Sequence, residues 1–91
     1  MLIISQNRES VVNMSSLFEI SVGKAMKSRG KKPAEAIPAV FAAKGTQECL
    51  LGKYETETRC KEILTDICEQ YHKFLNFPGA EGNTVFMMPE E

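Results

Sequence analysis

"TETRCKEILTDICEQYHKFL", residues 56–75, carries the strongest structural signal in this chain of 91 residues. Its apolar side chains recur at steps of three and four residues, with polar and charged side chains between them. The apolar positions are Cys60, Ile63, Leu64, Ile67, Cys68, Tyr71, Phe74 and Leu75. This spacing predicts one long amphipathic helix with a single buried stripe. Thr56 is suited to cap its N-terminus, and Pro78 lies just beyond its end.

The segments around this helix have the lengths and turn signals of short strands. The predicted strands are residues 1–5, 10–12, 17–22, 37–43, 48–54 and 84–88. The first two flank a polar turn, and Lys44, Gly45 and Thr46 separate residues 37–43 from residues 48–54, so each pair predicts a hairpin. The chain is therefore expected to form one α+β domain, residues 1–91, in which a mostly antiparallel sheet of about five strands packs on the helix.

Composition favours a folded, soluble protein. Apolar residues make up 43% of the chain and charged residues 25%, which is ordinary for a globular domain and too apolar for a disordered one. No apolar run approaches membrane-spanning length, and the apolar start, residues 1–4, is too short for a signal sequence. A cytoplasmic location and no membrane partner are expected.

No catalytic or metal-binding signature is present. Cys60 and Cys68 would lie about 12 Å apart on the helix, too far for a disulfide, so three reduced, mostly buried thiols are expected, including Cys49. His72 could face Cys68, but two ligands do not make a zinc site. We therefore expect no metal, no cofactor and no enzymatic activity.

The stretch "GKAMKSRGKKP" (residues 23–33) concentrates positive charge in a chain of net charge -1. It holds Lys24, Lys27, Arg29, Lys31 and Lys32, whereas the rest of the chain has six basic and twelve acidic residues. Its glycines, serine and proline predict a flexible basic loop over residues 23–36. Such a loop attracts anions and contacts phosphates without reading bases. Three readings stay open: a solvated loop without ligand, a site for a phosphate-bearing small molecule or nucleic acid, and a contact with an acidic protein.

Three predicted strands carry apolar residues on both faces. In "AVFAA", "CLL" and "VFMM" successive residues are apolar, whereas a half-solvated antiparallel sheet alternates. A single helix covers only one face of a sheet. The second face is therefore expected either to be buried in a homo-oligomer, with Phe41, Leu51 and Phe86 as interface candidates, or to be covered by residues 23–36.

Two stretches resemble a known group of proteins. "LLGKYETETRCKEIL" (residues 50–64) and "VFMMPEE" (residues 85–91) are similar to short uncharacterised proteins of Firmicutes and their phages. In that group a strand ending in Leu-Gly-x-Tyr leads through a threonine cap into a helix, and a last strand ends in Met-Pro. The resemblance spans most of the chain except residues 23–36. It implies an origin in a phage or mobile element, where such proteins often neutralise a host component.

Two functional hypotheses follow. The first is a small non-enzymatic binding protein that antagonises host defence in the host cytoplasm. It would be a homo-oligomer whose basic loop sequesters a nucleotide signal or a nucleic-acid complex such as a CRISPR effector. The alternative is a protein-interaction module that binds a host protein through its apolar sheet face, with the basic loop incidental.

Overall fold

The structure is a computed structural model that describes residues 1–16, 19–76 and 85–91, and of residues 27–29 and 32 it describes the backbone only. The described elements are β1 (Leu2–Ile4), β2 (Val11–Asn13), the 3₁₀ turn η1 (Met14–Ser16), β3 (Glu19–Arg29), β4 (Lys32–Lys44), β5 (Gln47–Lys53), α1 (Glu57–Asn76) and β6 (Val85–Met87). The α+β class is confirmed. The strands, however, form two sheets of three, in the orders β2-β1-β6 and β3-β4-β5, and not one sheet of about five.

Helix α1 begins and ends within one residue of its prediction. The Thr56 hydroxyl oxygen accepts a hydrogen bond of 3.1 Å from the Arg59 amide, which satisfies one of the free donors of the first turn. The fully buried side chains of the helix are Cys60, Ile63 and Ile67. These three positions follow the three-and-four spacing, so the periodicity of the sequence located both the helix and its buried stripe.

The buried stripe of α1 is narrower than the sequence pattern suggests, and this corrects the prediction for the cysteines. Cys60 is buried, Cys49 is half-buried and Cys68 is exposed. Cys68 follows Ile67 directly, and a step of one residue turns a side chain about 100° around the helix axis, away from the core. Burial, together with the nearby Glu57 carboxylate, raises the pKa of the Cys60 thiol, so this thiol is held in its unreactive protonated form.

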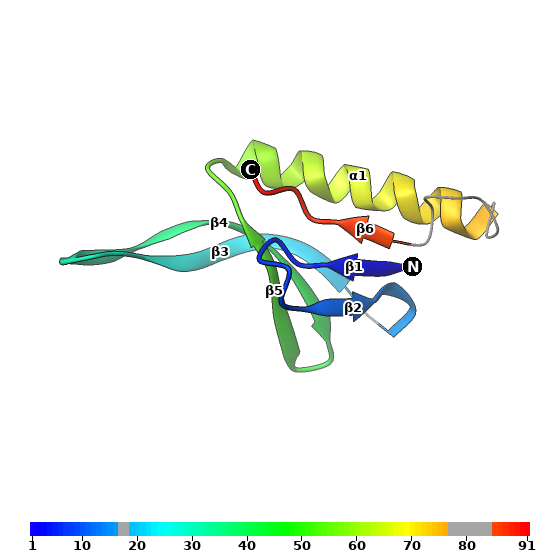
Figure 1. The fold of residues 1–91 in the computed structure, drawn as a ribbon, viewed down its shortest axis with the longest axis horizontal. Coiled ribbons are helices and arrows are strands. Elements are labelled where there is room, and N and C mark those ends of the chain that lie inside the picture. The colour runs from blue at the N-terminus through cyan, green and yellow to red at the C-terminus, as the bar shows by residue number, and fades with distance from the viewer. Residues whose placement is uncertain (17–18, 77–84) are drawn as a thin grey trace.

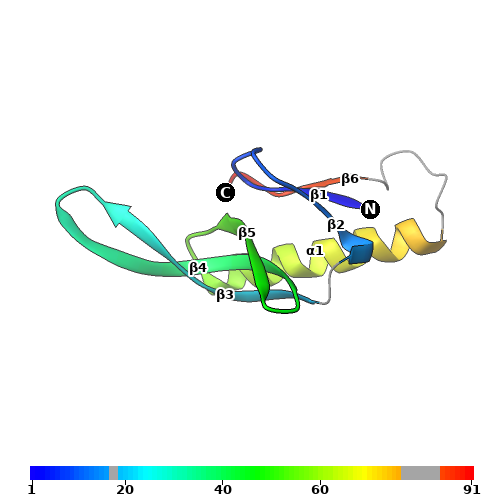
Figure 2. The same ribbon diagram turned by 90° about the horizontal axis from the view of Figure 1, so that it is seen from below.

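The two sheets and the helix enclose one core. β1 pairs with β2 antiparallel and with β6 parallel. Figure 1 shows β6, β1 and β2 side by side, and in Figure 2 this sheet lies on one side of the molecule, with α1 and the β3-β4-β5 sheet on the other. The largest fully buried side chains are Ile3, Val40, Leu51, Cys60, Ile63, Ile67 and Met88. Every layer therefore contributes to the core.

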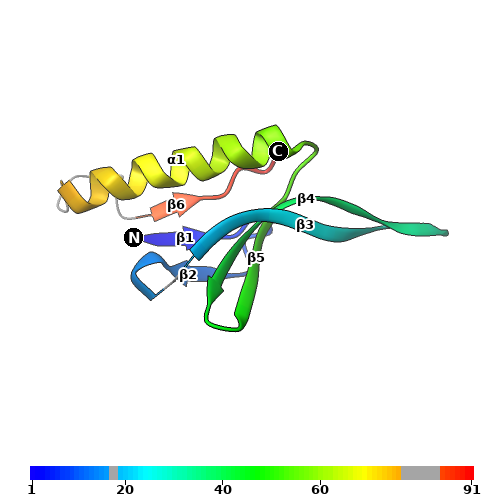
Figure 3. The same ribbon diagram turned by 180° about the vertical axis from the view of Figure 1, so that it is seen from behind.

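Residues 23–36 are not a loop. They form the outer halves of β3 and β4, which pair from Glu19 opposite Ala43 to Arg29 opposite Lys32. This part of the hairpin projects from the body as a two-stranded ribbon, which we call the arm (Figure 3), and the molecule measures 49 × 26 × 21 Å. Gly30 begins the two-residue turn with a left-handed φ of 67°, a conformation that glycine adopts without steric cost.

The turn from β5 into α1 joins the two sheets. The Tyr54 ring folds back over Gly52, and its hydroxyl donates a hydrogen bond of 2.7 Å to the carbonyl of Pro89, just after β6. The Gln6 side chain, just after β1, bridges the backbone at the end of β5 and the backbone after β6. Its side chain accepts from the Lys53 amide at 2.8 Å and donates to the carbonyls of Lys53 at 2.9 Å and Glu90 at 2.8 Å. We call this set of contacts the clasp.

Gly52→Ala is expected to destabilise the fold, because the new Cβ atom would lie 2.6 Å from the Tyr54 hydroxyl oxygen and under 3 Å from two ring carbons. The Tyr54 ring is buried and tied to Pro89, so it cannot move aside freely. We expect the free energy of unfolding in urea to fall by about 1–3 kcal/mol. Gly23→Ala is the control, since its Cβ would meet only the edge of the Phe41 ring, at 3.3 Å. A Gly52→Ala protein as stable as Gly23→Ala would contradict this account of the clasp.

Candidate functional site

The five clustered basic residues all lie on the arm. Lys24, Lys27 and Arg29 belong to β3, Lys31 to the turn and Lys32 to β4. The Lys24 and Lys31 side chains are exposed, and those of Lys27, Arg29 and Lys32 lie outside the described part of the structure. Residues 23–36 contain five basic residues and one acidic residue, whereas the remainder of the chain contains six basic and eleven acidic residues. The arm thus has a formal charge of +4 and the rest of the chain -5.

The strand register gathers positive charge at the tip of the arm. Arg29 and Lys32 are opposite each other, and Lys31 lies in the turn between them. Like charges on directly opposite residues of an antiparallel pair destabilise it. A bound anion would remove this cost, because it would place a negative charge among the three cations. The tip is therefore the part of the arm with the most to gain from an anionic ligand.

The arm is poorly suited to pair with a further strand. β5 pairs with β4 only from Ala39 onward, so along residues 32–38 the far edge of β4 has no neighbouring strand among the described residues. Pro33 and Pro38 lack the backbone N–H that a new strand would need, and prolines and lysines are the usual protection of exposed edges. The free edge of β4 along the arm is therefore protected against pairing with a third strand.

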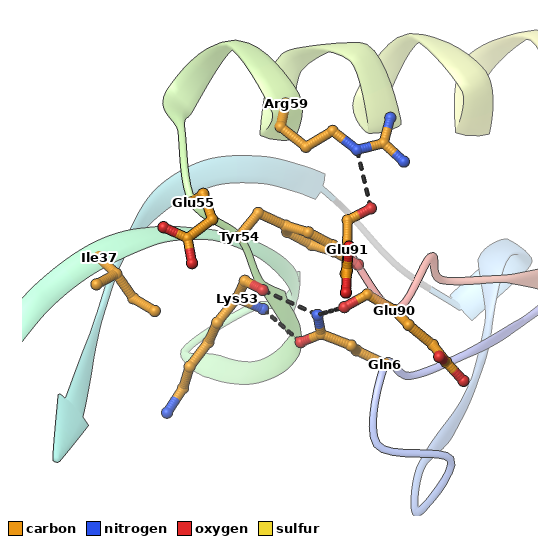
Figure 4. A pocket seen from close by; sticks show the side chains of 8 residues that line it. All are labelled: Gln6, Ile37, Lys53, Tyr54, Glu55, Arg59, Glu90 and Glu91. Carbon is orange, nitrogen blue, oxygen red and sulfur yellow. Dashed lines mark hydrogen bonds between the residues drawn. The ribbon is translucent and has the colours of Figure 1, made fainter. Parts of the chain in front are cut away.

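A cleft of about 570 Å³ lies at the base of the arm (Figure 4). It is lined by Gln6, Ile37, Lys53, Tyr54, Glu55, Arg59, Glu90 and Glu91. The Lys53 ammonium donates to the carbonyl of Met26 at 2.9 Å, and the Arg59 guanidinium donates to the carbonyl of Glu91 at 3.0 Å. Both cations of the cleft therefore already hold backbone carbonyls, and three carboxylate side chains share its walls. This charge distribution does not favour an anion. The two hydrogen bonds instead connect the arm, at Met26, and the segment after β6, at Glu91, to the body.

The interface candidates from the sequence do not form one surface. Leu51 is only 1% exposed and packs in the core, so its assignment to an interface is wrong. Phe86 is half-buried and packs against the same core. Phe41 is half-buried, and its ring lies over Gly23. Runs of apolar residues in β4, β5 and β6 located these strands but did not tell the inner face from the outer face.

The described part of the chain contains neither a metal site nor a membrane-spanning helix. Cys68 and His72 are both exposed, and no group of three His, Cys, Asp or Glu residues among the described residues could hold a metal ion. No helix in residues 1–16, 19–76 or 85–91 is long and apolar enough to cross a membrane.

Comparison of the chain with protein-family models, with curated proteins and with solved structures gives no match. The resemblance to proteins of Firmicutes and their phages therefore stays a prediction.

The clasp is expected to make stability depend on pH in the alkaline range. Burial raises the pKa of Tyr54 from 10.0 to about 12. Between pH 10 and pH 12 the unfolded chain loses this proton while the folded protein keeps it, so the free energy of unfolding falls as the pH rises. Tyr54→Phe has no proton to lose at this position. Urea denaturation at pH 9 and pH 11.5 should show the wild type losing more stability than Tyr54→Phe. Equal losses in the two proteins would contradict the buried, hydrogen-bonded hydroxyl.

Proposed function

We propose that this chain is a non-enzymatic binding protein whose arm contacts the phosphate backbone of nucleic acid. The observation that carries the proposal is the projection of a two-stranded ribbon of formal charge +4 from a body of formal charge -5. Charge separation on this scale creates a strong local potential at the arm while the body repels a polyanion. Contact would then be confined to the arm.

The shape of the arm favours an extended polyanion over a small nucleotide. The β3 positions from Gly23 to Arg29 span about 20 Å at 3.3 Å per residue. A mononucleotide could reach only part of that length, whereas duplex DNA presents a phosphate charge about every 1.7 Å along its axis. A two-stranded ribbon also fits the major groove, which is about 12 Å wide. The dimensions therefore support nucleic acid as the ligand.

Binding of this kind is expected to be insensitive to sequence. Lys and Arg contacts to phosphates fix a protein on the duplex but carry no base information. The arm contains no aromatic residue that could stack on a base. A basic ribbon that occupies phosphates could antagonise a nucleic-acid complex of host defence; the resemblance itself implies only that a host component is neutralised. Phage origin, that role and sequestration of a nucleotide signal remain predictions.

A salt titration tests the proposal. The probe is a fluorescent 30-base-pair DNA duplex, and its anisotropy is measured from 50 to 300 mM KCl. The logarithm of the wild-type association constant should fall with the logarithm of the salt concentration, with a slope of about -3 to -4. This is the slope expected for about four phosphate contacts. The triple variant Lys24→Ser, Lys27→Ser, Lys31→Ser should lose two to three units of that slope and at least about 30-fold in affinity at 50 mM KCl.

The matched control removes the same charge from the body. The control is the triple variant Lys44→Ser, Lys61→Ser, Lys73→Ser, which changes the last residue of β4 and two residues of α1. All three lysines are exposed, and the variant changes the net charge by the same amount as the arm variant does. It should bind within about threefold of wild type. Equal weakening by the two triple variants would show that net charge alone matters, and binding unchanged by the arm variant would refute the proposal. Phe41→Glu alters a residue that only the alternative hypothesis, protein docking through the sheet face, places in the binding surface. It should therefore leave DNA binding intact.

A further inference from the structure

We infer that two copies of this chain associate through the outer face of the β2-β1-β6 sheet, independently of any nucleic acid. This face consists of the outward positions of the three strands, which are Leu2, Ile4, Val11, Asn13, Val85 and Met87. The intervening residues Ile3, Val12 and Phe86 point inward, to the core.

The register brings the apolar side chains of this face together. Ile4 is directly opposite Val11 on one side and Met87 on the other, and Leu2 lies between Asn13 and Val85. Cross-strand neighbours of this kind are in contact distance. Five of the six positions are apolar, so the face is a continuous patch and not a set of isolated apolar residues.

The patch is exposed in the single chain. The exposed fractions are 41% for Leu2, 59% for Val11, 41% for Val85 and 55% for Met87. Four of the seven large apolar residues that are exposed in the described part of the chain thus lie on this one face. In Figure 2 this sheet forms one side of the molecule, and α1 and the β3-β4-β5 sheet both lie below it, on the side of its inner face.

The area agrees with the apolar centre of a stable interface. At the ordinary sizes of these residues the patch exposes roughly 400 Å² of apolar surface. A standard interface buries about 800 Å² per partner, of which roughly 55–65% is apolar. The patch therefore supplies most of the apolar area that one partner needs, and polar residues around it would supply the rim.

The chemistry of the patch selects a second copy as its occupant. None of the six positions is ionisable, so a two-fold axis through the patch would bury no unpaired charge. Asn13 is the one polar member, and its side-chain oxygen already accepts hydrogen bonds from the Ser15 amide and hydroxyl at 3.1 and 2.8 Å. Two such sheets can pack face to face at about 10 Å with interleaved side chains. A second copy would present the same uncharged and mostly apolar face.

Self-association would also give each assembly two arms. Two linked binding elements raise apparent affinity for one long ligand without any new contact. This consequence depends on the proposed function, but the association itself does not.

Sedimentation equilibrium tests the inference at 500 mM KCl, with nucleic acid removed so that it cannot bridge chains. Wild type at about 100 μM should have twice the 10.2 kDa chain mass. Val11→Glu and Met87→Glu should each weaken the dimer at least about 100-fold, because a carboxylate would be buried without a partner. Leu75→Glu is the matched control, since Leu75 at 60% is as exposed as Val11 but lies near the end of α1. It should remain dimeric.

A monomeric wild type would overturn the inference, and the face would then be left for a different protein to cover. A dimer that survives both Val11→Glu and Met87→Glu would also overturn it, because the interface would then lie elsewhere. Circular dichroism checks that each variant is folded. If either glutamate variant unfolds, Val11→Thr replaces it, since threonine keeps the shape of valine and should still weaken the dimer by about tenfold.

Discussion

The clasp around Tyr54 is the contact on which the rest of the structure depends. The β2-β1-β6 sheet and the β3-β4-β5 sheet share no strand. The Tyr54 hydroxyl on Pro89 and the Gln6 amide on Lys53 and Glu90 join the end of β5 to the segments that follow β1 and β6. Because β1 and β6 are parallel, both segments lie at the same end of the β2-β1-β6 sheet. Each hydrogen bond contributes only about 1 kcal/mol, but together they connect the segments that flank the core of Tyr54, Ile63 and Ile67. Gly52 is required at the centre of this arrangement, because any side chain there would strike the Tyr54 ring.

The clasp also explains how a small domain can support a projecting arm. Where its side chains are described, the arm buries none of them fully, and its strands would be marginal as an isolated hairpin. Its base is held at two places, by the Tyr54 amide on the Pro38 carbonyl at 2.9 Å and by the Lys53 ammonium on the Met26 carbonyl at 2.9 Å. Both contacts come from the residues that form the clasp. The same few residues therefore close the core and direct the positive charge away from the acidic body.

The sequence predicted those elements whose pattern is produced by burial. Helix α1 and the strands near the core have one buried face, so their apolar spacing shows them directly. None of the described side chains of the arm is buried, and its backbone pairing leaves no trace in the hydrophobic pattern, so Gly23, Gly30 and Pro33 suggested a loop. One signal for the hairpin of the arm was available in the sequence. Gly30 occupies the same place in its turn as Gly45 does in the turn between residues 37–43 and 48–54, which was predicted as a hairpin. The two glycines have similar φ angles, 67° and 62°. The division into two sheets was out of reach, because the parallel pairing of β1 with β6 joins residues that are more than 80 positions apart.

The most direct test of the central claim is a nuclear magnetic resonance titration of the ¹⁵N-labelled protein with the DNA duplex. The claim is that the arm is an ordered ribbon and that it is the contact surface. The free protein should show cross-strand contacts between Met26 and Ala36, and the amide signals that shift on titration should belong to residues 24–36. Random-coil signals from residues 24–36 in the free protein, or shifts confined to α1 and the cleft at the base of the arm, would contradict it.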